Sequence, residues 1–237
     1  SQGNAALYFG MQAEDGLYKS IVGAQQGDIY TPSSLDSVVR VVPTDSYLVA
    51  GDYVPGHIFL LPSSSNTYRI PFMSEDPGLF GDVLNDFVER YELDFVLIDT
   101  APTMSMFDGS VYMATDAFIH VTELEIGSLE GLKNSFDQIN RFNKRRVRDG
   151  KEANRVLGIV LNKMRNLREH VENAVMVKQA FPELVAPPVR QLKNYAAATK
   201  YGQTVRAYKP NGTEAPEILA MVDYIEKAIV QWITETA

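Results

Sequence analysis

The chain has 237 residues, 45% of them hydrophobic and 22% charged, with no cysteine and a formal net charge of −8. The absence of cysteine excludes disulfides, thiolate zinc sites, iron–sulfur clusters and cysteine nucleophiles. The negative charge argues against a protein that coats nucleic acid with its whole surface, although it leaves room for one basic patch. No run of ~18 apolar residues and no charged-then-apolar leader occurs, so we expect a cytoplasmic protein without a membrane-spanning helix.

Hydrophobic periodicity predicts alternating helices and strands in the first half of the chain. In "DPGLFGDVLNDFVERYEL", Leu79, Val83 and Phe87 recur at helical spacing, whereas "DFVLID" is a continuous apolar run that ends in a carboxylate. The predicted elements are a helix over 16–27, a strand over 57–65, a helix over 76–93, a strand over 94–99 and a helix near 107–115.

The second half continues the same alternation. The predicted elements are strands over 117–122 and 155–163, helices over 127–146 and 167–180, a short strand and turn over 183–189, and a last helix from about Thr213. We expect the last helix to bury Ile218, Val222, Ile225, Ile229 and Trp232. Continuous apolar strands between helices predict a single-domain α/β fold, with a doubly wound, mostly parallel sheet that helices cover on both faces.

Asp99, at the end of "DFVLID", is the first candidate functional residue. Ligands of such sheets bind beyond the carboxyl ends of the strands. A carboxylate fixed there could hold a magnesium-bound water beside a nucleotide. The alternative is that Asp99 caps the next helix or bonds its own loop, which many strand-end aspartates do.

Six segments, in order along the chain, resemble the ParA/MinD group of P-loop ATPases, and ParA-like partition ATPases most. "DFVLIDTAP" resembles the Walker B segment of that group, and "SQGNAALYFG" resembles its segment after the catalytic Asp. The other four are "ATDAFIHVTELEIGSLEGL", "LGIVLNKM", "YAAATKYGQTV" and "YKPNGTEAPEILAMVDYI". The resemblance implies the P-loop NTPase fold, ATP and Mg²⁺ as cofactors, and ATP hydrolysis.

A phosphate-cradling loop is missing from these residues. The only Gly-Lys pair is Gly150-Lys151, followed by Glu152, and Arg145 stands where the first glycine of a P-loop would be. The resemblance places the P-loop, and the catalytic Asp, ahead of Ser1. One interpretation is a longer ATPase whose central strand and P-loop helix lie outside this numbering. The other is a non-hydrolysing pseudo-ATPase that acts as an adaptor for DNA or a partner protein.

The resemblance also implies roles for individual residues. Asp99 would hold Mg²⁺ through water, and Asn162 would bond the adenine, since an amide offers both a donor and an acceptor; alternatively, Asn162 bonds only its own loop. Pro188 and Val189 would lie near the base, and Thr100, Pro102 and Thr103 would form a γ-phosphate-sensing switch. Gln2, Gly3 and Asn4 would form a switch-like loop after the catalytic Asp, or a simple turn.

A basic run, "RFNKRRVRDGK" over 141–151, has six Lys or Arg against Asp149, a net +5 that leaves −13 for the rest of the chain. Cations at the end of a helix also complement its dipole, so a solvated helix end is one interpretation. The other is contact with DNA phosphates, through Arg145, Arg146 and Arg148. Lys193, Lys200 and Arg206 form a second, sparser candidate set.

The resemblance implies an ATPase that partitions or positions DNA or another large cargo. By resemblance, it would form an ATP-dependent homodimer, bind DNA without sequence preference, associate with the nucleoid and respond to a cargo adaptor of the ParB kind. The tail "EKAIVQWITETA" has two Glu against one Lys, so we do not expect membrane docking. The three histidines, His57, His120 and His170, lack the spacing of metal ligands.

Overall fold

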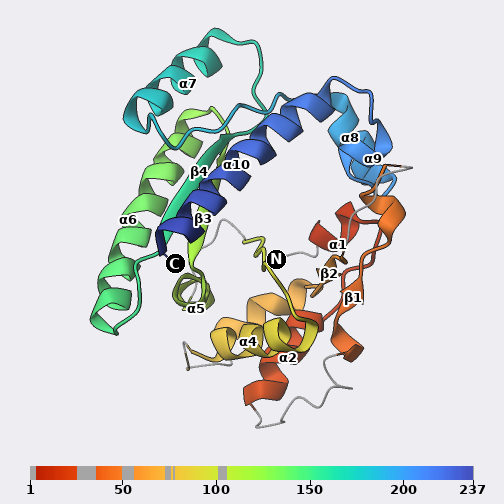
Figure 1. The fold of residues 1–237 in the computed structure, drawn as a ribbon, viewed down its shortest axis with the longest axis vertical. Coiled ribbons are helices and arrows are strands. Elements are labelled where there is room, and N and C mark those ends of the chain that lie inside the picture. The colour runs from red at the N-terminus through yellow and green to blue at the C-terminus, as the bar shows by residue number, and fades with distance from the viewer. Residues whose placement is uncertain are drawn as a thin grey trace. The chain divides into compact units, whose positions relative to one another are not determined.

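A computed structural model describes residues 4–25, 36–49, 56–72, 76, 78–100 and 106–236. These residues fall into two compact units, one of residues up to 114 together with 197–208, and one of 115–196 together with 209–237. Figure 1 shows their elements. The single-domain organisation stays a prediction, and each unit is described by itself.

The first unit is mostly helical around one apolar core. Ile21, Ile70, Phe80, Val83 and Phe87 form the centre of that core. Its elements are α1 (Asn4–Tyr8), α2 (Gly16–Gln25), β1 (Arg40–Val41), the 3₁₀ helix η1 (Thr44–Ser46), β2 (Phe59–Leu60), the 3₁₀ helix η2 (Ser65–Phe72), α4 (Leu79–Tyr91), α5 (Met106–Ala114) and α9 (Val205–Tyr208). The strands β1 and β2 pair antiparallel, with Arg40 opposite Leu60.

Two glycines let the late segment of the first unit approach its N-terminal segment. Gly10 and Gly202 both have positive φ, of 68° and 64°. A Cβ atom on Gly202 would clash with the Gly10 Cα. Only glycine at 202 permits this backbone contact, because no side chain can be moved out of the way.

The predicted strand over 94–99 is wrong. Residues 95–100 form no helix or strand, and the Leu97 side chain is 86% exposed, with Phe95 and Val96 exposed as well. A strand needs a neighbouring backbone for its N–H and C=O groups. No described segment pairs with 94–99, so Phe95, Val96 and Leu97 are exposed, and only Ile98 packs against the core. The predicted strand over 57–65 shrinks for the same reason to the two residues of β2.

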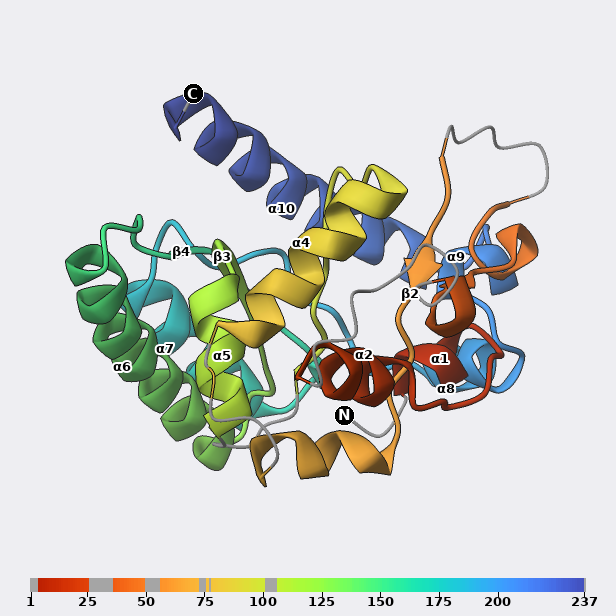
Figure 2. The ribbon, with the colours of Figure 1, turned by 90° about the horizontal axis from the view of Figure 1, so that it is seen from below.

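The second unit is a parallel strand pair between helices. Its elements are β3 (Ala117–Thr122), α6 (Ile126–Arg148), β4 (Arg155–Leu161), α7 (Arg168–Ala180) and α10 (Glu214–Thr236), with α8 (Lys193–Lys200) divided between the two units. These bounds match the predicted elements closely. Figures 1 and 2 agree in placing α6 on one side of β3 and β4, and α10 on the other.

Alternation along β4 explains the two faces of this unit. Ile159 and Leu161 pack with Leu132 of α6 and Val177 of α7. Val160 points to the other face, into a cluster with Ile218 and Met221 of α10. The predicted strand over 183–189 contributes only an isolated bridge from Val185 to Ile159. The α/β fold class, with helices flanking parallel strands, is confirmed.

Candidate functional site

The strands β3 and β4 end side by side. They run parallel, with Thr122 in register with Leu161, and the Asn162 N–H donates to the Thr122 carbonyl at 2.8 Å. The residues that follow both strands are therefore gathered at one edge. The carboxyl edge of a parallel sheet is where α/β proteins place their ligands.

The side-chain amide of Asn162 bonds the fold through its oxygen and has a free nitrogen among the described residues. Its Oδ1 accepts the Lys163 N–H at 2.9 Å, and Lys163 has a left-handed backbone with φ of 52°. The carboxamide oxygen thus fixes the turn, as the loop-bonding alternative expects. No described residue accepts a hydrogen bond from the amide nitrogen. The adenine-binding role of Asn162 stays a prediction.

Pro188 and Val189 lie beside Asn162. The Val189 N–H donates to the Leu161 carbonyl at 2.9 Å, and the Met164 N–H donates to the Val189 carbonyl, also at 2.9 Å. Leu161 and Met164, the residues that bond Val189, lie on either side of Asn162 in the sequence. Val189 itself is buried in the cluster that contains Val160. The three residues predicted near a base are thus gathered at one edge, although the Val189 side chain belongs to the core.

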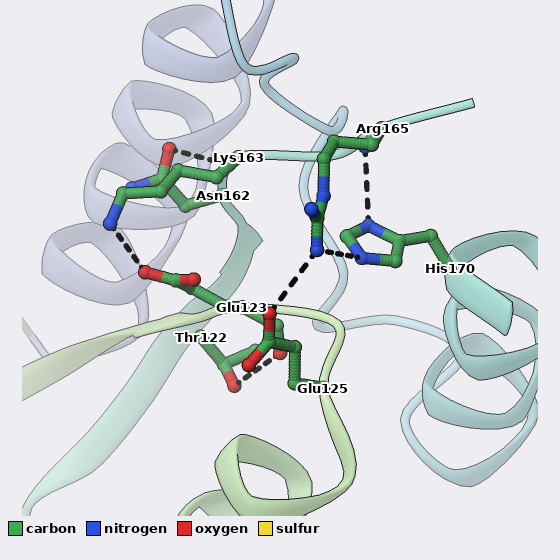
Figure 3. Close-up of polar contacts among 7 residues, drawn as sticks. All are labelled: Thr122, Glu123, Glu125, Asn162, Lys163, Arg165 and His170. Carbon is green, nitrogen blue, oxygen red and sulfur yellow. Dashed lines mark hydrogen bonds and ion pairs between the residues drawn. The ribbon is translucent and has the colours of Figure 1, made fainter. Parts of the chain in front are cut away.

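Two ion pairs cross this edge, as Figure 3 shows. Lys163 Nζ lies 2.5 Å from Glu123 Oε1, and Arg165 Nη2 lies 3.2 Å from Glu125 Oε1. Sequence motifs gave no functional role to these four residues. The signal that could have found them is the matched spacing, with acids at positions 123 and 125 after one strand and bases at 163 and 165 after its neighbour.

The buried His170 anchors the loop after β4. Its Nδ1 accepts the Arg165 N–H at 3.2 Å, and Arg165 Nη2 lies 3.2 Å from its Nε2 (Figure 3). From the next turn of α7, Asn173 donates its amide to the Leu124 carbonyl at 2.8 Å. The first two turns of α7 thereby hold both strand-end loops in place.

The remaining predicted nucleotide residues belong to the first unit. Asp99 and Thr100 are exposed in the extended segment after α4, and Asn4 is the first residue of α1. Gln2, Gly3, Pro102 and Thr103 lie outside the described residues. Within the described part of the chain, no cluster of three or more Asp, Glu or His side chains could hold a metal ion by itself. The magnesium role of Asp99 stays a prediction.

The basic run divides into exposed and buried members. Arg145 and Arg148 are exposed at the end of α6, and both lie near Asp149, at 3.5 and 3.9 Å. The Arg146 side chain is only 7% exposed, and its Nε donates to the Glu152 carbonyl at 2.7 Å. In the second set, Lys193 and Lys200 are exposed at the two ends of α8. Arg206 is exposed on α9. Contact of either set with DNA stays a prediction.

Comparison with known proteins gives the fold its context. No family model matches the chain. Protein IncC of Escherichia coli is 28% identical over 137 residues, which are 56% of this chain and 37% of IncC. The chain thus spans less than half the length of this relative.

Two solved structures cover nearly the whole chain. A single-residue variant of Cyanothece McdA, in complex with ATP, has a TM-score of 0.66 at 17% identity, and the match covers 96% of this chain and 81% of that one. MinD of Pyrococcus horikoshii, complexed with Mg-ADP, has a TM-score of 0.63 at 17% identity and covers 96% and 79%. The chain has the fold of the ParA/MinD ATPases. The resemblance expected from the motifs is confirmed.

No described helix has both the length and the hydrophobicity that a membrane span requires. The longest helices are α6 and α10, with 23 residues each, and both carry several charged side chains.

Proposed function

We propose that this chain is part of a ParA-like ATPase that positions DNA or another large cargo. In this proposal ATP, held with Mg²⁺, drives formation of a homodimer that binds DNA without sequence preference. A phosphate-binding loop would come from outside residues 1–237, and an adaptor of the ParB kind would stimulate hydrolysis.

The observation that carries the proposal is the carboxyl edge of β3 and β4. Asn162 presents an unused amide donor there, between the two backbone bonds of Val189. A purine edge has acceptors that such a donor can reach. The exposed ion pairs of Lys163 with Glu123 and of Arg165 with Glu125 join the two strand-end loops at this edge.

The residues present fit a nucleotide with its metal only in part. The strand-end Asn162 suits the base, and Asp99 is an exposed carboxylate able to hold a magnesium-bound water. Bound Mg²⁺ would neutralise charge on the phosphate oxygens, which phosphoryl transfer requires more than covalent help. The McdA and MinD structures with ATP and Mg-ADP support this choice of cofactors.

The test is nucleotide binding by the full-length polypeptide that contains these residues. We expect Asn162→Ala to raise the Kd of Mg-ATP about tenfold, which corresponds to one lost hydrogen bond of ~1.4 kcal/mol. The Kd of Mg-tripolyphosphate, which has no base, should not change. Asn166→Ala, in the exposed loop four residues later, is the matched control and should bind ATP like the parent chain.

Residues 1–237 alone should bind Mg-ATP weakly or not at all, because their sequence has no P-loop motif to cradle phosphates at a helix N-terminus. Micromolar affinity of this fragment in calorimetry would contradict the proposed division of the site. A full-length protein that binds DNA or a partner but hydrolyses no ATP would favour the adaptor alternative.

A further inference from the structure

The outer side of α7 has an apolar stripe that stays exposed in the described part of the chain. Leu167, Val171 and Val175 are 45%, 46% and 48% exposed, and they recur every four residues from the N-cap of the helix. We call these three residues the α7 stripe. Single exposed apolar side chains are common on protein surfaces, whereas three on successive turns form a continuous patch. The helix lies at the rim of the second unit (Figure 1), so another molecule can reach the stripe.

The stripe is separate from the face that attaches α7 to its own unit. The buried residues of that face are His170, Asn173, Ala174 and Val177. At ~100° per residue, the centre of the buried face lies roughly 110° around the helix from the centre of the stripe. The packing of α7 on its own unit therefore does not explain why Val171 and Val175 are apolar. The helix has a second apolar side that is available to a partner.

Two opposite charges lie along one flank of the stripe. Arg168 Nε lies 2.6 Å from Glu172 Oε1 in the same helix, and the two side chains are 91% and 57% exposed. An ion pair this exposed contributes little to stability. Within a single helix, a base four residues before an acid is also the less favourable order. Both charges are thus available to a partner that presents the reverse order.

An antiparallel second copy of α7 matches the stripe. When two copies pack with Val171 on a two-fold axis, Val171 meets Val171. Leu167 of each copy then meets Val175 of the other, because both lie four residues from the axis. Shifting the axis by two residues in either direction would set one member of the stripe against Gln179 or Lys163. This register alone faces every residue of the stripe with an apolar residue.

The same register brings opposite charges together. Arg168 lies three residues before the axis and Glu172 one residue after it, so each Arg168 is ~3 Å along the helix from Glu172 of the second copy. Lys178 lies seven residues from the axis and therefore beyond the apolar centre. The buried face is turned roughly 110° away from the stripe, so the bodies of the two copies lie clear of the contact.

We infer that the α7 stripe is a contact between two copies of this chain, packed antiparallel about Val171. The contact is separate from the ATP-driven homodimer proposed above and needs no nucleotide, because Asp99 and Asn162 take no part in it. Three half-exposed side chains from each copy bury far less than the ~1,200 Å² of a stable interface, so the pair is transient. Apolar spacing and flanking charge are both self-complementary, as a two-fold contact requires, which favours a second copy over another protein.

Disulfide crosslinking tests the inference, because residues 1–237 contain no native cysteine. Val171→Cys is made in the full-length polypeptide, with any cysteine elsewhere changed to Ser, and is oxidised with diamide in the absence of nucleotide. The two thiols meet across the axis, so we expect a covalent dimer to form about tenfold faster than in Met176→Cys. Met176 is the matched control, because it is 53% exposed on another side of the same helix.

Two further variants test the antiparallel arrangement. Leu167→Cys and Val175→Cys should each form little dimer alone, because each thiol lies ~12 Å along the helix from its own counterpart. Mixed in equal amounts, the two variants should crosslink with each other. Self-crosslinking at all three positions of the stripe would indicate a parallel pair and overturn the inference. Equal rates for Val171→Cys and Met176→Cys would indicate random collision and also overturn it.

Charge exchange tests the flank of the contact. In the Val171→Cys protein, adding Glu172→Arg should slow crosslinking, because Arg168 then faces a base in the second copy. Adding Arg168→Glu as well should restore the rate. An unchanged rate in the first variant, or no recovery in the second, would overturn the proposed register. These measurements contain no nucleotide, so their failure would leave the proposed ATPase function standing, and a chain that binds no ATP could still form the crosslink.

Discussion

Arg146 stabilises the fold, whereas Arg145 and Arg148, its neighbours in the basic run, are exposed and able to reach a ligand. The Arg146 guanidinium is buried, bonds the Glu152 carbonyl, and lies 3.9 Å from Asp116. We expect Arg146→Ala to lower the free energy of unfolding by ~2–3 kcal/mol, because it removes a buried side chain together with its hydrogen bond to the Glu152 carbonyl. Arg148→Ala, at an exposed position, should change it by less than ~0.5 kcal/mol. Urea unfolding measures both, and equal effects would contradict the assigned role of Arg146.

His120 makes the second unit sensitive to acid. Burial against Phe136 lowers the pKa of His120 to about 4, from the ordinary 6.5. Its Nε2 is buried with no hydrogen-bond partner among the described residues. At any pH between these two values, the His120 ring is therefore mostly protonated in the unfolded chain and mostly neutral in the folded chain. The stability contributed by the neutral ring is present above pH 6.5 and is lost as the pH falls toward 4.

The expected loss from His120 is about 2 kcal/mol between pH 7 and pH 5. The carboxyl groups of Asp15 and Asp36 have a lowered pKa, so their protonation also makes the folded protein less stable, but at a lower pH. His120→Phe keeps an aromatic ring on Phe136 and removes the titration. The difference between the unfolding free energies of the two proteins should change by about 2 kcal/mol between pH 7 and pH 5. Parallel pH profiles would refute the buried neutral state.

At the scale of elements, Gly158 sets how closely α10 packs on β4. Its missing side chain leaves room for Ile225, whose Cδ1 would lie 2.6 Å from an added Cβ atom. We expect Gly158→Ala to destabilise the protein by ~1–2 kcal/mol through overpacking. Ile225→Val removes the clashing methyl group, so the double variant should recover ~1 kcal/mol relative to additivity. A double-mutant cycle from thermal unfolding measures this coupling, and strict additivity would mean that the helix shifts as a whole.

Elements whose partners lie within the described chain could be predicted from the sequence, and elements that need other partners could not. The strand 117–122 forms with the predicted bounds because β4 pairs with it over its whole length. The segment 94–99 is as apolar, yet it forms no strand, since no described backbone lies beside it. Val222 belongs to the apolar stripe of the last helix but is exposed, because periodicity predicts which face of a helix is apolar and not which segment covers that face.

The candidate site shows the same limit at single residues. Asn162 was predicted because an amide after a strand suits a purine edge, and the fold brings it beside Val189. The ion pairs of Lys163 and Arg165 could not be predicted from motifs, because only the register of β3 on β4 brings their acidic partners within reach. The basic run could be located by composition, whereas the burial of Arg146 depends on where residues 149–152 turn back under the end of α6.

At the scale of the whole molecule, the net charge limits which part of the surface can bind DNA. The net charge of −8 repels a polyanion, so binding must concentrate on a local cluster such as the end of α6. Because Arg146 is buried, Arg145 and Arg148 are the two of the three arginines predicted to contact DNA that are exposed to phosphates. Their shared partner Asp149 would be exchanged for phosphate on binding.

Neutralising both exposed arginines therefore tests the DNA hypothesis without disturbing the fold. In the ATP-bound full-length protein, Arg145→Ala together with Arg148→Ala should weaken binding to unrelated DNA sequences about equally. The slope of log K against log salt concentration should flatten by ~1.8, since each lost phosphate contact removes about 0.9. ATP turnover without DNA should stay unchanged, because neither residue lies at the carboxyl edge of β3 and β4. Arg168→Ala on α7, where the side chain is exposed and paired with Glu172, is the control and should leave the slope as it is. An unchanged slope in the double variant would make the run a solvated helix end, and it would transfer the DNA hypothesis to Lys193, Lys200 and Arg206.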